Sequence, residues 1–374
     1  MMSNRNYLGI TALYSLMGVT AGTLGSLMVL VQRSSGASLS QIGFMVSLFS
    51  LGSLIGIALF NSWSSTLVAG KVVPAGFGTL IAGYFFIVNS SNASISLMSS
   101  LILGIGFGVL DLGLAQIVTR SKNNSPVKTN ISNAIFGLGG IAGSAFVALF
   151  GIQALKNLTY LILAIGVLAS YLLSDNSWKS QKASKKIFDF APRKVVLPTL
   201  AATGIYVALE LSAASWLPSL VESRNQNGEE GAAATALFYA LFTAGRFIGA
   251  YLSRTMTAEK LIQFSLLLTL PPIAMAIVID EPSIFLIALT GLSLGPIFAN
   301  TMTFLVSATP DNHGASALAL YASMTGSLIL FPVIGVVVDA STVGSFPIIL
   351  LVLLLASTLF YRISFTAKRA GAVD

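Results

Sequence analysis

The chain has 374 residues, of which 55% are hydrophobic and only 9% are charged, and its mean hydropathy is +0.86. A soluble domain needs more polar surface than this composition provides, so most of the protein surface must face lipid. The absence of cysteine and the single histidine, His313, exclude disulfides, thiolate metal sites and multi-histidine metal clusters. The net charge of +7 is scattered between apolar runs, which indicates orientation in a membrane rather than nucleic-acid binding.

Twelve apolar runs follow one another, each long enough for a helix to cross a bilayer. The first is too long for a signal-peptide core, so we expect it to remain as a span. The expected spans are residues 7–31, 41–62, 71–89, 95–119, 130–152, 156–174, 195–221, 232–253, 258–279, 283–307, 314–338 and 343–365. One long polar stretch, residues 175–194, separates the first six from the last six. We therefore predict an all-α integral membrane protein with a six-helix half at 1–174, a basic linker at 175–194 and a second six-helix half at 195–374.

The basic residues predict the orientation of these spans, because short cytoplasmic loops carry an excess of lysine and arginine. With the amino terminus inside, only Arg33, Lys156 and Arg224 lie outside. The bases then expected inside are those of the linker together with Arg5, Lys71, Arg120, Lys122, Lys128, Arg254, Lys260, Arg362, Lys368 and Arg369. We predict a multi-pass protein of the cell membrane with both termini cytoplasmic and a linker that can touch lipid headgroups.

The two halves share a weak internal repeat of glycines. The run Gly52–Gly56 in the second span matches Gly245–Gly249 in the eighth. The run Gly104–Gly108 in the fourth span matches Gly291–Gly295 in the tenth at a similar offset. Parallel half-repeats of this kind are typical of transporters that hold their solute between the halves near the middle of the bilayer.

Several strings make the chain resemble the major facilitator superfamily, and within it the fucose-permease-like sugar transporters. They are the Asn133 to Gly143 stretch, Glu210 followed by a small-residue patch and Trp216, the Gly245-Arg246 pair, and Gly295-Pro296-Ile-Phe298. The resemblance implies two pseudo-symmetric six-helix halves and proton-coupled sugar transport by alternating access. It does not extend to the first span, which has no acid, or to the loop after the second span, which lacks the usual run of charges.

Three ionisable residues lie well inside the expected spans: Asp111, Glu210 and Arg246. A charge at this depth costs about 3 kcal/mol on insertion scales, so it requires a cavity, a partner or a function. A carboxyl group in a low-dielectric cavity can take up and release a proton near neutral pH, so either acid could couple transport to protons or anchor the solute. Each could equally be a satisfied buried polar group. Arg246 lies near the cytoplasmic end of its span, where we expect a gating or structural role.

A sugar site needs groups that hydrogen-bond hydroxyls and aromatic faces that cover the apolar side of the ring. Each candidate below could also be a packing residue, and Trp216 could anchor its helix at the membrane interface. The candidates for substrate binding are Tyr14, Gln116, Asn133, Tyr206, Trp216, Tyr239, Asn300 and Tyr321.

Together these features predict a secondary active transporter for a small polar solute, with sugar and proton as the expected pair and sodium as the alternative ion. The glycines around Gly137–Gly143 lie in an apolar helix without a preceding strand, so we expect no dinucleotide or other cofactor. No nucleophile, base and orienting group can be proposed together, so an enzyme is not expected. A monomer is expected. An exporter of amphipathic compounds and a non-transporting solute sensor are the alternative functions.

Overall fold

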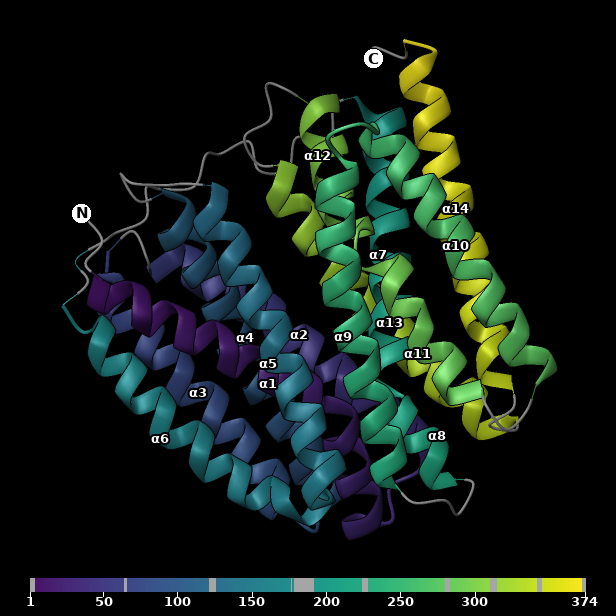
Figure 1. Cartoon of the computed structure of the whole chain (residues 1–374). Coiled ribbons are helices and arrows are strands. Elements are labelled where there is room, and N and C mark those ends of the chain that lie inside the picture. Colours follow the sequence, from purple (N-terminus) through teal and green to yellow (C-terminus); the bar gives the residue numbers. More distant parts are fainter. Residues whose placement is uncertain are drawn as a thin grey trace.

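The structure is a computed structural model that describes residues 4–63, 66–120, 126–175, 177, 192–223, 228–279, 283–309, 315–341 and 345–371. These residues form helices and connecting turns, without a strand (Figure 1). The helices are α1 (Asn4–Ser35), α2 (Leu39–Trp63), α3 (Ala69–Asn89), α4 (Ala93–Arg120), α5 (Pro126–Phe150), the 3-10 turn η1 (Ile152–Ala154), α6 (Leu155–Leu173), α7 (Arg193–Ser215), α8 (Leu217–Ser223), α9 (Gly228–Leu252), α10 (Ala258–Val278), α11 (Ser283–Leu294), α12 (Ile297–Ala308), α13 (Ala315–Ala340) and α14 (Phe346–Arg369).

The helices account for the twelve expected spans. Within the described residues, eleven helical segments are long and apolar enough to cross a membrane, and the described part of α5 adds a shorter apolar one, Ala134–Phe150. In hydrocarbon every backbone N–H and C=O must be paired internally, and a helix does this within its own segment. The prediction of an all-α membrane protein with twelve spans is confirmed.

Two spans expected as continuous helices are each interrupted once. Span 195–221 divides into α7 and α8 at Trp216, and span 283–307 divides into α11 and α12 at residues 295–296. Each interruption has a proline, Pro218 two residues after Trp216 and Pro296 within the other break, where it lacks an N–H and excludes the carbonyl four residues earlier. Pro218 thus frees the carbonyl of Ala214, which accepts a hydrogen bond from the Thr235 hydroxyl at 3.2 Å.

The helices fall into two groups that diverge toward the upper side of Figure 1, where α1 begins and α14 ends. We call this side the termini face and the other side the opposite face. Helices α1 to α6 pack on one another, and α7 to α14 form the second group. Between the groups, α2 packs on α13, α5 on α9, and α1 on α8 and α9. The contact of α1 with α8 lies at the opposite face, so the two groups meet there.

The repeat glycines lie at equivalent helix contacts in the two groups. In the first group, Gly52 and Gly56 of α2 and Gly104 and Gly108 of α4 each face backbone of the other helix at distances that leave no room for a Cβ. In the second group, Gly245 of α9 faces the backbone of α11, and Gly291 of α11 and Gly295 just after it face the backbone of α9 in the same way. Small residues allow membrane helices to approach closely, so the repeat marks the same kind of close helix contact in each of the two groups.

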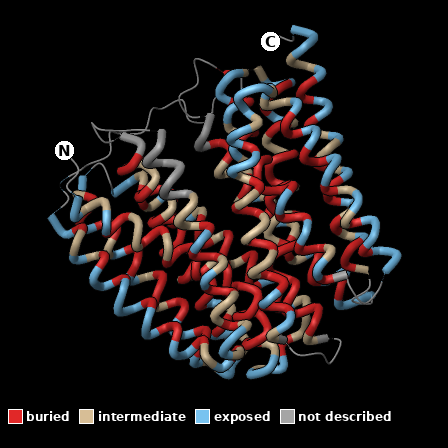
Figure 2. The backbone as a smooth tube through the Cα atoms, in the orientation of Figure 1, coloured by how far each residue is buried: buried red, intermediate tan, exposed pale blue. Residues whose placement is uncertain are grey.

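Exposed residues lie on the outside of the bundle and buried residues fill its interior (Figure 2). Many of the exposed side chains are large and apolar, including Leu149, Tyr251 and Val278. An apolar outer surface of this kind suits lipid as its solvent.

Candidate functional site

The acid of the second half, Glu210, lies in α7 one turn after Tyr206, so both side chains occupy the same face of the helix. The Tyr206 hydroxyl lies 2.5 Å from Glu210 Oε2 and 2.9 Å from the backbone carbonyl oxygen of Leu294. Leu294 is the last residue of α11, at the interruption of that span. Tyr206 is fully buried, whereas Glu210 is half-buried. We call these three residues, with Arg246, the Glu210 cluster.

Arg246 approaches this cluster from α9. It interacts electrostatically with Glu210 and with Tyr206. Its guanidinium also lies over the Phe242 ring, 4.5 Å from the ring centroid, in a cation–π contact. Tyr239, two turns earlier on α9, is buried and also interacts electrostatically with Glu210. The structure thus places a half-buried acid, a half-buried arginine and two buried tyrosines at the junction of α7, α9 and α11.

The acid of the first half, Asp111, lies in α4 and is half-buried. Tyr14 of α1 is buried and interacts electrostatically with it. Each half of the chain therefore has an acid inside a membrane span and a tyrosine that interacts with it electrostatically. Within the described residues there is no group of three His, Asp or Glu side chains that could hold a metal ion.

The other predicted binding residues are dispersed. Trp216 is fully buried at the α7–α8 junction, 6.2 Å from the Phe346 ring, and its indole N–H has no hydrogen-bond acceptor among the described residues. Asn300 is buried and donates to the carbonyl of Pro296, the residue just before its own helix, at 2.8 Å. Tyr321 of α13 accepts a hydrogen bond from Asn61 of α2 at 3.4 Å.

Besides Tyr14, two predicted binding residues belong to helices of the first half. Gln116 lies in α4, five residues after Asp111, and is half-buried. Asn133 lies in α5, but its side chain is outside the described residues, as is the whole of His313. The structure therefore draws together Tyr206, Glu210, Tyr239 and Arg246, and separately Tyr14 and Asp111.

One charged contact between the halves was not singled out from the sequence. Arg33, near the end of α1, donates from Nε and Nη2 to the two carboxylate oxygens of Glu222 in α8, both at 2.6 Å. The side chains are 39% and 21% exposed. We call this contact the opposite-face pair. The sequence did carry a signal for this contact. Arg33 and Glu222 each closely follow a span, in loops that the alternation of spans assigns to the same side of the membrane.

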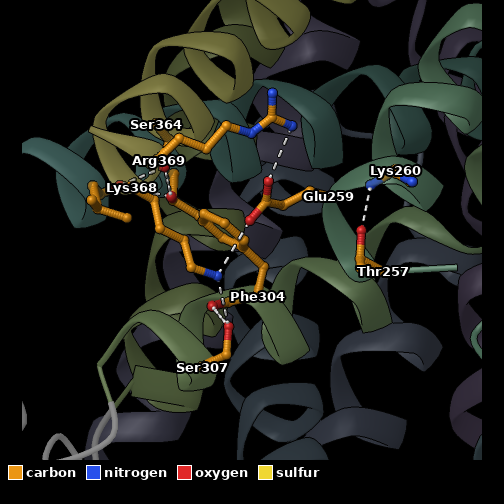
Figure 3. Close-up of polar contacts among 10 residues, drawn as sticks. Thr257, Glu259, Lys260, Phe304, Ser307, Ser364, Lys368 and Arg369 are labelled. Carbon is orange, nitrogen blue, oxygen red and sulfur yellow. Dashed lines mark hydrogen bonds and ion pairs between the residues drawn. The ribbon is translucent and has the colours of Figure 1, made fainter. Parts of the chain in front are cut away.

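A second charged cluster joins three helices at the termini face (Figure 3). Glu259 at the start of α10 pairs with Lys368 and Arg369 at the end of α14, each at 3.3 Å. Lys368 also donates to the Ser307 hydroxyl at 3.2 Å and lies 4.5 Å from the centroid of the Phe304 ring, both on α12. The cluster ties the second segment of the broken span, α12, to α10 and α14.

Solved structures share the fold at low sequence identity. A variant of the nucleoside transporter NupG superposes with a TM-score of 0.78 at 13% identity, covering 96% of this chain and 99% of that one. The D-xylose-proton symporter gives 0.73 at 13% identity, covering 96% and 95%. A variant of the E. coli fucose:proton symporter FucP gives 0.66 at 15% identity, covering 97% and 99%. These likenesses show the fold alone.

No curated protein sequence matches the chain. The sequence profile of the Major Facilitator Superfamily, however, matches residues 10–332, which is most of the chain. The profile and the fold agree with the resemblance inferred from the glycine and acidic motifs. The chain therefore belongs to the Major Facilitator Superfamily, and it is a multi-pass membrane transporter rather than an enzyme.

Proposed function

We propose that the chain moves a sugar or a similar polar solute, such as a nucleoside, by alternating access in symport with protons. The observation that carries the proposal is the pair of acids in the membrane-spanning region, Asp111 and Glu210, one in each half. Acids at this depth are costly and mark ion or substrate pathways. The similar structures are a nucleoside transporter, a D-xylose-proton symporter and a fucose:proton symporter, so these solutes are the first to test.

The chemistry of the two acids supports proton coupling. A carboxyl group in an apolar bundle favours its neutral form, while a nearby guanidinium favours the carboxylate, so both states are accessible. Glu210 lies between these influences because Arg246 is its charged neighbour. A group that changes charge while the helices around it rearrange can make solute movement depend on a proton gradient.

The two halves provide the movable parts. The opposite-face pair and the close approach of α1 to the α7–α8 junction join them at one face, where a Cβ on Gly25 would lie 2.4 Å from the carbonyl oxygen of Ser215. At the termini face the groups diverge (Figure 1). We further propose that the termini face is cytoplasmic in the cell membrane, so that this is the conformation in which solute exchanges with the cell interior.

The test is uptake into proteoliposomes of labelled fucose, xylose, further sugars and nucleosides, with and without an inward proton gradient. The variants are Glu210→Gln and Asp111→Asn, and Glu230→Gln is the matched control because Glu230 is exposed at the start of α9. We expect the native protein and Glu230→Gln to accumulate one solute in response to the gradient. At least one of the other two variants is expected to lose that response while still exchanging solute at equal concentrations.

Other results would replace the proposal. Accumulation under a sodium gradient alone would change the coupling ion, and gradient-driven movement out of the compartment would favour the exporter. If no sugar or nucleoside moves under either gradient, the proposed function is wrong. Solute binding without movement would then support the sensor.

A further inference from the structure

The hydroxyl of Tyr206 has more hydrogen-bond neighbours than it has protons. It lies 2.5 Å from a carboxyl oxygen of Glu210 and 2.9 Å from the carbonyl oxygen of Leu294. A phenol has one proton to donate, and a backbone carbonyl can only accept. The protonation state of Glu210 therefore decides how many of the two contacts are hydrogen bonds.

With Glu210 ionised, the carboxylate and the carbonyl compete for the single phenolic proton. With Glu210 protonated, its own O–H donates to the oxygen of Tyr206, and the phenolic O–H is free to donate to Leu294. Both contacts are then satisfied at once. A buried carbonyl without a donor is costly, so the second arrangement stabilises Leu294 where it lies.

The carbonyl in question belongs to the interruption of a span. Leu294 ends α11, and Gly295 and Pro296 separate it from Ile297, the first residue of α12. In an unbroken helix the Leu294 carbonyl would accept from the N–H four residues later. In the described part of the chain, its donor is the Tyr206 hydroxyl instead. An interrupted helix with one side-chain cap is a place where two segments can change their relative angle.

The charges around Glu210 come from a limited set of groups. Arg246 and Tyr239 of α9 act on it electrostatically, and Tyr361 of α14 acts on Tyr206. Helices α11 and α12 carry no titratable side chain. The other titratable residues on the elements packed against α7 are Arg5, Tyr7, Tyr14 and Arg33 on α1, Glu222 on α8, Glu229, Glu230 and Tyr251 on α9, Tyr321 and Asp339 on α13, and Arg362, Lys368 and Arg369 on α14.

We propose that Tyr206 is a positioning residue that transmits the protonation of Glu210 to the break between α11 and α12. Protonation caps the Leu294 carbonyl and holds the two segments in the arrangement seen here. Loss of the proton returns the phenolic O–H to the carboxylate and frees the break to move. The inference deepens the proposed function, on which it rests for the link to solute movement, and it concerns an event that can be measured without any solute.

The test is hydrogen–deuterium exchange of the peptides that span residues 291–300, in the purified full-length protein at about pD 5 and about pD 8, on either side of the range in which a buried acid changes charge. Every variant is compared with the native protein at the same pD, so that the intrinsic rate cancels. We expect Tyr206→Phe to exchange about fivefold faster than native at low pD, the effect of one hydrogen bond, and within about twofold of native at high pD. Glu210→Gln can donate permanently to Tyr206, so its protection should not depend on pD.

Tyr361→Phe is the matched control. Tyr361 is another fully buried tyrosine, and its hydroxyl lies 2.6 Å from that of Thr301 on α12. Removing this hydroxyl should change exchange by the same factor at both pD values and keep the native pD response. A purely structural role for Tyr206 would give the same behaviour.

Two results would overturn the proposal. One is a ratio of the Tyr206→Phe exchange rate to the native exchange rate that is the same at both pD values. The other is a Glu210→Gln protein that still responds to pD, and this result is decisive even if Tyr206→Phe does not fold. Failure of all solutes in the uptake assay would refute the symport proposal but would leave these exchange results, and the relay, unaffected.

Discussion

The opposite-face pair offers a direct test of how the halves are held together. Arg33 and Glu222 form two parallel hydrogen bonds of 2.6 Å between α1 and α8, so the pair must break whenever the halves separate at this face. Replacing either residue with glutamine removes the charge attraction; Glu222→Gln keeps the side-chain size, whereas Arg33→Gln also shortens the side chain. We expect Arg33→Gln and Glu222→Gln to increase the population that is open at the opposite face.

The size of the effect follows from the geometry. Exposed ion pairs contribute up to about 1 kcal/mol, and bidentate pairs lie at the upper end of that range. The side chains are 39% and 21% exposed, so solvent screens the pair and a larger contribution is not expected. A contribution of about 1 kcal/mol changes an equilibrium about fivefold. Because the attraction is screened, raising the ionic strength should open the native protein in the same direction.

The absence of cysteine makes the measurement simple. Spin labels at Gln153→Cys in η1 and Ala340→Cys at the end of α13 place one exposed reporter on each half at the opposite face. Double electron–electron resonance then gives the populations of short and long distances. Arg5→Gln is the control, because Arg5 at the start of α1 pairs at 2.8 Å with Asp175, just after α6 and at the termini face, so this pair does not join the two halves.

A double-mutant cycle provides the refutation. If the pair holds the halves, the double variant should open no more than the more strongly affected single variant. Effects that simply add would show that each residue acts without the other. Unchanged distance populations in both single variants, or the same shift in Arg5→Gln, would contradict the reasoning about this pair.

Further predictions concern packing and the termini-face cluster. A Cβ on Gly326 would lie 2.2 Å from the carbonyl oxygen of Gly204, so Gly326→Ala should force α13 from α7, cost about 1 to 3 kcal/mol, and lower the midpoint of thermal unfolding. Gly78→Ala is the matched control, because nothing lies within 4 Å of a Cβ there, and its midpoint should stay at or above native. Glu259→Gln should weaken the pairs with the two basic residues at the end of α14 by less than about 1 kcal/mol, with a small loss of thermal stability that disappears in high salt.

The sequence by itself was sufficient to locate the membrane spans, because a span is specified by the hydropathy of consecutive residues and not by contacts between distant ones. A run of about 20 apolar residues must be helical in hydrocarbon, since no other local structure pairs its backbone groups. The glycine repeat indicated that the two halves are related, and the structure adds that those glycines lie at the α2–α4 and α9–α11 contacts. The rarity of membrane-embedded charge was enough to single out Asp111, Glu210 and Arg246.

Only the tertiary structure decided which groups meet. The contacts of Tyr206 with Leu294 and of Arg33 with Glu222 join residues 88 and 189 positions apart. Such contacts depend on how each helix is rotated about its axis and where each span is interrupted, and a uniformly apolar run specifies neither. The acid could be found from its residue type, but its partner Tyr206 also contacts a backbone carbonyl at a proline break, and no side-chain motif records that contact. Rotation and packing of the helices therefore determined which groups meet at the site, while hydropathy determined the membrane-spanning helices that carry them.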